Sequence, residues 1–379
     1  MEQRRKNLTQ LFIPICLETL LYMLSGMVDT LMLSSVNDQA VGAVGTANTY
    51  IGIFIIMFSV ISSGMVAVMT QNIGAGRPGV AYQARQLGLA FNAVLGIIMS
   101  LFLSLGAGTI LSGVGVADAL MQPAKTYLQI VGGFCILNAL IPICSSYLRA
   151  FGFSKEPLYA SIIGNVINFC LNAFFLFVLH KGVAGVATAT VISRIINLVI
   201  VVLLGAVLVK AKQHPERESN RAVMGQIIRI GLPSACETAI YNVSMTLVIR
   251  FLNQMDAQGL NVTARSYTMQ ITNFSYCVGA ALAQANAIMT GWHIGAKEYD
   301  ACDRGTKKAA VIGVIVAVIL ETVFTLCSGW IMQLFSKDPQ MVSLVGKLLA
   351  IDIVLEIGRV TNLVYGQALK TSGDAVFPV

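Results

Sequence analysis

Charged residues are scarce in this sequence. Asp, Glu, Lys and Arg make up 11% of the 379 residues, whereas 56% are hydrophobic and the mean hydropathy is +0.75. A soluble globular domain carries about 25% charged residues. The composition therefore excludes a water-soluble protein of two or three domains, although the length alone would allow one.

Motifs for nucleotide hydrolysis, metal binding and covalent catalysis are also lacking. The sequence has no GxxxxGK[ST] phosphate loop, no HExxH and no CxxC, and its histidines, His180, His214 and His293, are far apart. No combination of nucleophile and base points to an active site. We therefore expect no enzymatic activity and no bound cofactor.

Long apolar stretches are what the sequence has instead. Each is near or above the roughly 20 residues that cross the hydrocarbon core of a bilayer. The stretches are continuous rather than alternating with a period of two, which predicts helices and not the strands of a barrel. They run approximately over 11–35, 44–73, 87–111, 121–149, 157–179, 184–209, 226–253, 264–292, 309–335 and 341–369. The predicted fold class is an all-α polytopic membrane protein.

One polar stretch divides these predicted helices into six and four. Residues 210–229 form the most polar part of the chain. We expect a linker at 210–225 between an N-terminal six-helix lobe, 1–209, and a C-terminal lobe, 226–379.

The two predicted lobes repeat one another in sequence. Pro14, Glu18 and Tyr22 recur 219 positions later (233 − 14) as Pro233, Glu237 and Tyr241. The motif Ile73-Gly74-Ala75 recurs 221 positions later (294 − 73) as Ile294-Gly295-Ala296, and Leu148 and Gly152 recur as Leu369 and Gly373. Because six helices precede the second copy, both copies enter the membrane from the same side. Transporters built from such parallel repeats bind their substrates near the midplane, between the repeats.

The repeat also predicts that the second lobe is shorter than the first. Subtracting the offset from the length, 379 − 221 = 158, places the last residue opposite Leu158. Counterparts of residues 159–212, two helices, would then be missing. The expectation is a ten-helix portion of a twelve-helix architecture, with four of six helices present in the second lobe.

Basic residues are unevenly distributed between the loops. Most of the 25 lie in loops on the side of the N-terminus, among them Arg77, Arg217 and Lys307. This asymmetry predicts a cytoplasmic N-terminus in the plasma membrane. It also accounts for the net charge of +7 through contact with anionic lipid, so we expect no nucleic-acid partner and a chain that functions as a monomer.

Glycines mark the ends of two repeated helices. Gly74 and Gly295 are each followed within three residues by a basic side chain, Arg77 and Lys297. Glycine at a helix end usually adopts the left-handed conformation of a C-cap. We expect Gly74 and Gly295 to be such caps.

Several further motifs occur together in a characteristic order. They are Val28-Asp29-Thr30-Leu31-Met32, Gln71-Asn72-Ile73-Gly74-Ala75-Gly76-Arg77, then Asn165, Asn168 and Asn172, and Gly182-Val183-Ala184-Gly185-Val186-Ala187. The three asparagines have the spacing of one helix face. With the repeat, this order resembles the multidrug and toxic compound extrusion (MATE) family of cation-coupled antiporters, whose superfamily also includes lipid-linked oligosaccharide flippases.

The resemblance implies a two-lobed protein of twelve helices that exports amphipathic, often cationic drugs and toxic compounds. Export would be exchanged for Na⁺ or H⁺ by alternating access. It also implies a cation-responsive site at Asp29 with Asn168 and Asn172, to which Thr188 or Thr190 would contribute. In one branch of the family the acids of the second lobe stand where Tyr241 and Arg359 are here, whereas this sequence has acids one turn earlier, at Glu237 and Glu356.

Charged residues within the apolar stretches point to the same regions. They are Glu18, Asp29, Arg194, Glu237, Glu321, Asp352, Glu356 and Arg359. A charge at the bilayer centre costs at least about 2.5–3.5 kcal/mol, and such residues mark ion and substrate pathways. We predict Asp29, Glu237 and Glu356 as cation-coupling acids, with Na⁺ possible at Asp29 or Glu237. The predicted substrate cavity comprises Glu18, Tyr22, Asn165, Tyr241, Gln284 and Arg359.

Structural roles are the alternatives for these residues. Asp29 could be a solvated acid at a helix end, Glu237 could be hydrogen-bonded to Tyr241 or Asn242, and the asparagines could serve inter-helix packing. Glu356 and Arg359 are three residues apart, so they can form an ion pair on one helix face.

Two other functions remain as alternatives to antiport. A lipid or lipid-linked oligosaccharide flippase would favour several basic residues along the cavity, and the first lobe offers chiefly Arg194. A channel or a membrane sensor belongs to a different class, and a channel usually takes its pore from the symmetry of an oligomer. This chain instead supplies its own pair of lobes.

Overall fold

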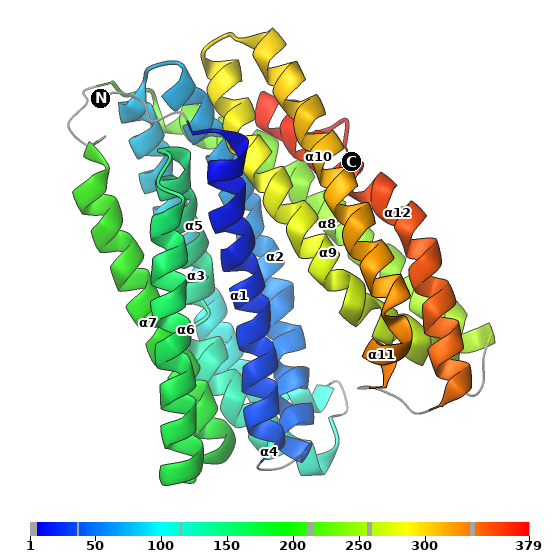
Figure 1. Ribbon diagram of the computed structural model, residues 1–379. Coiled ribbons are helices and arrows are strands. Elements are labelled where there is room, and N and C mark those ends of the chain that lie inside the picture. The colour runs from blue at the N-terminus through cyan, green and yellow to red at the C-terminus, as the bar shows by residue number, and fades with distance from the viewer. Residues whose placement is uncertain are drawn as a thin grey trace.

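The protein is all-helical in the computed structural model, which describes residues 6–35, 38–113, 116–210, 216–255, 260–333 and 338–378 (Figure 1). No strand occurs within these ranges, which confirms the predicted fold class. The α-helices are α1 (Leu8–Ser34), α2 (Asp38–Gly74), α3 (Pro78–Gly113), α4 (Asp118–Tyr127), α5 (Ile136–Ala150), α6 (Lys155–Ala173), α7 (Gly182–Leu208), α8 (Asn220–Met255), α9 (Leu260–Gly295), α10 (Tyr299–Leu326), α11 (Ser328–Met332) and α12 (Pro339–Ser372). Two π-helical segments, η1 (Leu128–Gly132) and η2 (Phe174–Val178), follow α4 and α6.

The fourth predicted helix is broken. Its two parts, 118–132 and 136–150, are bent by 42° relative to one another. A π-helical turn, η1, immediately precedes the bend, and π-bulges are a common cause of helix kinks. The kink tilts α5 relative to α4.

Composition supports fewer membrane spans than the ten predicted from apolar stretches. Within the described residues, six helices are long and apolar enough to cross a membrane, and the bent pair would make a seventh. Helices α8, α9 and α12 are as long, with 36, 36 and 34 residues, but they are more polar. They carry many of the acids and amides considered below.

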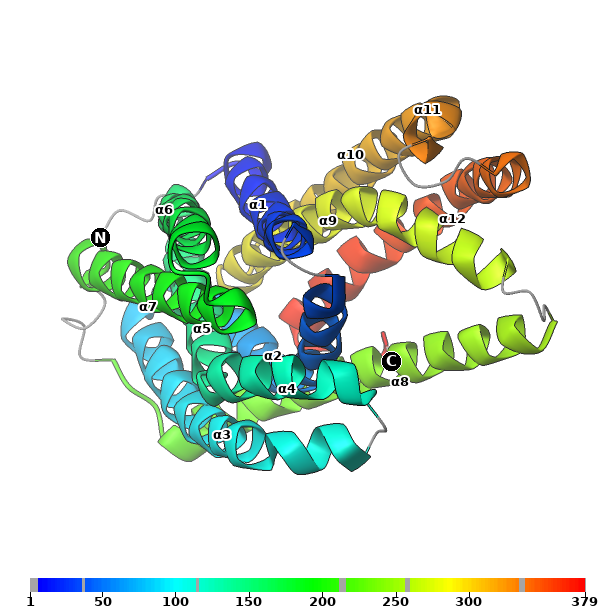
Figure 2. The ribbon, with the colours of Figure 1, turned by 90° about the horizontal axis from the view of Figure 1, so that it is seen from below.

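The helices form two groups, which we call the N lobe (α1–α7) and the C lobe (α8–α12). Both lobes meet at the end of the bundle that contains the loops after α2, α5 and α9 and the start of α8. We call this end the linker end and the opposite end the far end. In Figure 1 the linker end is at the top, and the ribbons of the two lobes diverge towards the bottom. Viewed from the far end, α1 and α2 face α9 and α8 (Figure 2).

The buried core explains how the lobes are held together at the linker end. One cluster of buried side chains there contains residues of both lobes, including Leu11, Met65 and Tyr147 with Ile227 and Trp292. Towards the far end the N lobe has a core of its own, and the C lobe has a separate one around α9, α11 and α12. Burial of apolar surface thus fastens the lobes at one end.

The linker between the lobes is shorter than predicted. Helix α8 begins at Asn220, so the last six residues of the expected linker, 220–225, are helical. Residues 211–215, with His214, lie outside the described residues.

The predicted glycine caps were wrong in one respect. Gly74 and Gly295 do end α2 and α9, but the left-handed residues are Gly76 (φ 73°) and Lys297 (φ 60°). Gly74 lies against the backbone of Trp292, and Gly295 lies against the carbonyl oxygen of Gln71, so closely that a Cβ atom would clash at either position. These glycines therefore allow α2 and α9 to cross.

Candidate cation and substrate site

An acid and two amides meet in the far half of the N lobe. The Nδ2 of Asn172 on α6 donates hydrogen bonds to Oδ1 of Asp29 on α1, at 2.6 Å, and to Oδ1 of Asn168, at 3.2 Å. Asn172 is fully buried and Asn168 is 5% exposed. The Oδ1 of Asn172 is buried and has no hydrogen-bond partner in the described part of the chain. The structure thus brings together the three residues that the resemblance pointed to.

Further polar residues of α4, α5 and α7 surround this group. Arg194 donates a hydrogen bond to Oδ1 of Asn138 at 2.9 Å and is close enough to attract the carboxylate of Asp29. Tyr127, 4% exposed, also lies within electrostatic range of Asp29 and Arg194. Arg194 was predicted as an intramembrane charge, whereas Asn138 and Tyr127 were not predicted as members of the site. A guanidinium inside a membrane helix needs a hydrogen-bond acceptor. This need was the signal in the sequence that could have pointed to a partner such as Asn138.

The other residues predicted for this part of the site have local partners. Asn165 donates to the carbonyl of Leu21 on α1, at 3.4 Å, which is the inter-helix packing role considered as its alternative. Thr188 and Thr190 donate to carbonyls of their own helix, at 2.7 and 2.9 Å, so their hydroxyl hydrogens are not directed at Asp29. Tyr22 is 64% exposed.

Three acids and an arginine cluster about halfway along the C lobe. The predicted pair is present, with Nη1 of Arg359 at 2.5 Å from Oε2 of Glu356. Arg359 also reaches Asp352 at 3.5 Å. Carboxylate oxygens of Asp352, Glu356 and Glu321 on α10 all lie within 4.8 Å of one another. The sequence marked these acids as intramembrane charges, but it gave no reason to join α10 to α12.

Glu237 does not share this cluster. It forms an ion pair with Lys370 of α12, whereas Tyr241 is 54% exposed and Asn242 donates to the carbonyl of Thr238. The structural alternative for Glu237, a hydrogen bond to Tyr241 or Asn242, is therefore not what the structure shows, because its partner is Lys370. Lys370 was not among the predicted site residues.

The ion pair of Glu237 has a counterpart in the N lobe. Nη2 of Arg149 on α5 lies 2.6 Å from Oε2 of Glu18 on α1. The acids are 219 positions apart (237 − 18) and the bases 221 (370 − 149), which are the offsets of the sequence repeat. In each lobe, an ion pair near the linker end therefore connects the first helix to the helix that carries the repeated base, α1 to α5 and α8 to α12.

Two hydrogen bonds between the lobes obey the same offset. Nε2 of Gln71 on α2 donates to the carbonyl of Thr371 at 2.5 Å, and the indole N–H of Trp292 on α9 donates to the carbonyl of Ala150 at 2.9 Å. The donors are related by 292 − 71 = 221 and the acceptors by 371 − 150 = 221. We call this pair the closure bonds. Each acceptor carbonyl directly follows the base of its lobe's ion pair.

Gln284 provides a further connection between the lobes at this end. Its Oε1 accepts a hydrogen bond from Nη1 of Arg149 at 3.3 Å. Arg149 thus contacts Glu18 within its own lobe and α9 of the other. Gln284 belongs to the contact between lobes and is also exposed.

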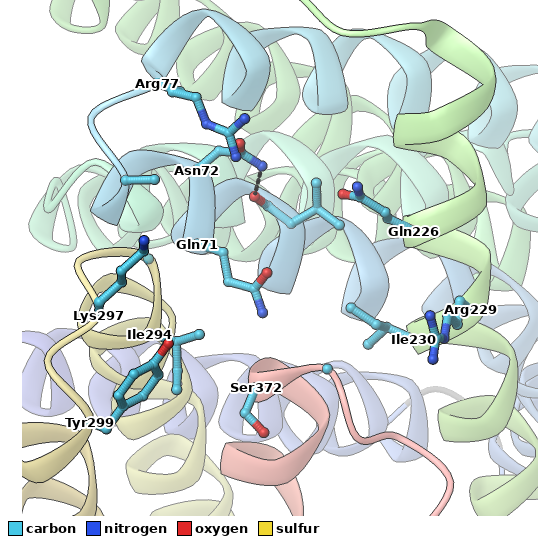
Figure 3. A pocket seen from close by; sticks show the side chains of 14 residues that line it. Gln71, Asn72, Arg77, Gln226, Arg229, Ile230, Ile294, Lys297, Tyr299 and Ser372 are labelled. Carbon is cyan, nitrogen blue, oxygen red and sulfur yellow. Dashed lines mark hydrogen bonds between the residues drawn. The ribbon is translucent and has the colours of Figure 1, made fainter.

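A hollow of about 490 Å³ opens at the linker end, between the ends of α2, α8, α9 and α12. Figure 3 shows Gln71 in its middle, with the amide directed towards Ser372, and Arg77, Arg229 and Lys297 around it. Its lining includes three basic residues and no acid among the described residues. Among the described residues, the lining of this hollow therefore offers no carboxylate to a cation.

Comparison with known proteins places the chain in a family. The family model described as MatE matches residues 14–174 and 233–379. The two matched segments begin at Pro14 and Pro233, which are repeat mates. The chain is 33% identical over 97% of its length to an uncharacterized transporter, YisQ, of Bacillus subtilis, and it covers 81% of that protein.

More distant relatives and solved structures agree with this assignment. A probable multidrug resistance protein, NorM, of Thermotoga maritima is 22% identical over 99% of the chain, with 82% of that protein covered. A crystal structure of a MATE protein in the bent conformation superposes with a TM-score of 0.88 at 17% identity, covering 97% of this chain and 82% of the other. The fold is therefore that of a multi-pass membrane transporter, and the chain belongs to the MatE family, that of the MATE transporters.

Proposed function

We propose that this protein is a secondary active antiporter that exports amphipathic, often cationic compounds in exchange for Na⁺ or H⁺. The observation that carries the proposal is the Asp29 group, in which a carboxylate inside an apolar helix is held by Asn172 at 2.6 Å. A carboxylate of this kind can exchange one cation for another, since it is fixed by neutral amides rather than neutralised by a contacting base. Relatives named as probable multidrug resistance proteins support the export of drugs.

The contact between the lobes supports an alternating-access mechanism. The lobes share a core and the closure bonds at the linker end, and each has its own core towards the far end. This arrangement corresponds to a transporter closed at one end. To open at the linker end, the transporter must break the closure bonds while the two lobes rock about their contact.

The proposal includes an orientation in the membrane. The linker end faces the cytoplasm of the plasma membrane, as the basic residues of its loops favour. The chain works as a monomer, and its partners are lipids, the coupling ion and small molecules. The closed linker end then faces the cytoplasm, and the Asp29 group lies towards the outside.

Transport in proteoliposomes tests the proposal. The purified chain is reconstituted, and movement of a fluorescent cationic dye such as ethidium is followed under an imposed Na⁺ gradient, an imposed pH gradient, or neither. We expect dye movement against its own gradient under one of the two ion gradients. Dye movement that responds to neither gradient would overturn the antiporter.

A further inference from the structure

The hollow at the linker end has a basic lining that the proposed transport does not use. It measures about 490 Å³, and its charged lining residues are Arg77, Arg229 and Lys297. Pockets for organic ligands have volumes of about 300–1,000 Å³, so this hollow is large enough for an organic molecule. Because the described lining contains bases and no acid, its charge favours an anionic ligand.

Two of the three bases have no ionic partner. Nη1 of Arg77 lies 2.6 Å from Oε1 of Glu218, just before α8. The side chains of Arg229 and Lys297 are exposed and form no ion pair with any described residue. These two positive charges are therefore available to a ligand.

The helix ends around the hollow do not need these bases as caps. At the end of α2, the backbone N–H groups of Gly76 and Arg77 donate to the carbonyls of Ile73 and Asn72. The end of α9 repeats both hydrogen bonds 221 positions later. This is the Schellman pattern, in which the backbone itself satisfies the last carbonyls of a helix. A capping role, which basic side chains often have at helix ends, therefore does not account for the basic lining.

Lys297 keeps its side chain at a backbone position that suits glycine. It is the repeat mate of Gly76 (297 − 76 = 221), and both are left-handed, with φ of 60° and 73°. Glycine is usual at this position of a Schellman cap, because a Cβ atom makes the left-handed conformation costly. Strained residues of this kind cluster at functional sites. Figure 3 shows the side chain of Lys297 at the edge of the hollow.

The bases reach the hollow from different sides. Arg77 follows α2, Arg229 lies on α8 and Lys297 follows α9 (Figure 3). A phosphate group presents oxygen atoms in several directions, whereas a carboxylate presents two in one plane, and guanidinium groups bind phosphate through paired N–H groups. We propose that this hollow binds the phosphate group of an organic molecule. The source is a phospholipid headgroup, which basic pockets between membrane helices bind, or a soluble phosphate ester.

A phosphate bound here would contact both lobes. Arg77 belongs to the N lobe, whereas Arg229 and Lys297 belong to the C lobe. A ligand stabilises the state that it binds more tightly, so the bound phosphate would hold the linker end closed. Binding does not rest on the proposed antiport, and only the leaflet that supplies the lipid rests on the proposed orientation.

The unfolding temperature of the purified full chain in phosphatidylcholine nanodiscs tests the site. It is measured with glycerol 3-phosphate, with succinate, a dicarboxylate of the same charge, and with NaCl, all at one ionic strength. A second set of nanodiscs contains phosphatidylglycerol, which carries glycerol and phosphate on acyl chains. Stabilisation by glycerol 3-phosphate would identify a soluble source, and stabilisation by phosphatidylglycerol alone would identify a lipid. Stabilisation by neither, or equally by succinate, would overturn the phosphate site.

A double variant tests whether the two unpaired bases hold the ligand. Arg229→Gln/Lys297→Gln should lower the affinity for the phosphate ligand at least tenfold. Arg304→Gln/Lys308→Gln is the matched control, because it removes the same charge from exposed positions of α10 outside the hollow. Its affinity should equal that of the parent. An equal loss in both double variants, or in neither, would overturn the site.

Lys297→Gly separates binding from folding. Glycine relieves the strain of the left-handed position, so the unfolding temperature without ligand should rise, whereas the stabilisation by ligand should shrink. The ligand should also slow hydrogen exchange of residues 71–77 and 292–298 in the parent. A full ligand response in Lys297→Gly would overturn the assignment of this residue to the site. If phosphate binds as expected but no ion gradient drives dye movement, the proposed function fails and the site stands.

Discussion

The two lobes are alike at the linker end and different farther from it. At the linker end each lobe has an acid–base pair, a carbonyl that follows the base, and a donor that reaches the carbonyl of the other lobe. Farther from the linker end, the N lobe holds one acid with amides, whereas the C lobe holds three acids with an arginine. The repeat is therefore preserved where the lobes contact one another and has diverged at the buried polar groups farther from that contact.

The repeat mates α1 and α8 show a second difference. Helix α1 packs against α6, and Asn165 and Asn172 of α6 bond to it. On the far half of α8, Tyr241, Val243 and Phe251 are 54%, 60% and 58% exposed. Within the described residues, the Asp29 type of group has no equivalent on α8, because it depends on a helix at the position of α6.

The contrast between the lobes predicts that removal of the Asp29 carboxylate has the largest effect on export. Asp29→Asn keeps the shape of the side chain but removes the charge that would bind the coupling cation, so export should fall to the level of cells without the protein. Dye export by cells and the amount of protein in the membrane are the measurements. Asp118→Asn, at the exposed start of α4, is the control. Undiminished export by Asp29→Asn would remove the N lobe from the coupling mechanism.

Charge reversal of the C-lobe ion pair should have the next largest effect. Lys370→Glu would place two acids together, and we expect a loss of about 1–3 kcal/mol of stability, below the roughly 3–5 kcal/mol of a fully buried pair, because Glu237 is 31% exposed. Glu237→Lys/Lys370→Glu should restore both the unfolding temperature and export. The same swap at Glu18 and Arg149 should behave alike. If only one of the two charge swaps restored the unfolding temperature and export, the two ion pairs would not be equivalent.

Crowding the crossing of α2 and α9 should loosen the linker end. Gly295→Ala places a methyl group on the carbonyl of Gln71, and overpacking of this kind costs about 1–3 kcal/mol. Hydrogen exchange of residues 71–77 and 292–298 should therefore become faster. Gly225→Ala is the control, since nothing lies within 4 Å of a Cβ there. Equal exchange in both variants would show that the crossing is not tightly packed.

Loss of the closure bonds should have the smallest effect on stability. Each hydrogen bond contributes about 0.5–1.5 kcal/mol, so Gln71→Ala and Trp292→Phe should each shift the balance towards opening at the linker end by a few fold. The double variant should show whether the two contributions add, in the same exchange measurement. A protected linker end in the double variant would mean that the core alone holds the lobes together.

The helices and the repeat could be predicted from the sequence because both depend on local patterns and spacing. The repeat also relates the bases of the two ion pairs, since Leu148 and Leu369 are repeat mates and the next residues are Arg149 and Lys370. The meeting of Glu321 with Glu356 could not be predicted, because the contact joins α10 to α12 and depends on how these helices pack. The predicted role of Gly74 as a left-handed cap was wrong for the same reason. Its contact with α9 depends on how the two helices pack, and the residues around Gly74 give no signal of that contact.

The central claim is that the closure bonds, which the two lobes share, close the transporter, whereas the Asp29 group, which only the N lobe has among the described residues, binds the ion. The ion dependence of export tests this claim. In one set of proteoliposomes, the maximal export rate and the half-saturating concentration of the coupling ion are measured for the parent, Gln71→Ala/Trp292→Phe and Asp29→Asn. We predict that the closure variant changes the rate and keeps the half-saturating concentration within about twofold, while Asp29→Asn abolishes the ion dependence. A closure variant with altered ion affinity, or an Asp29→Asn protein that still responds to the ion, would contradict this division between the two parts.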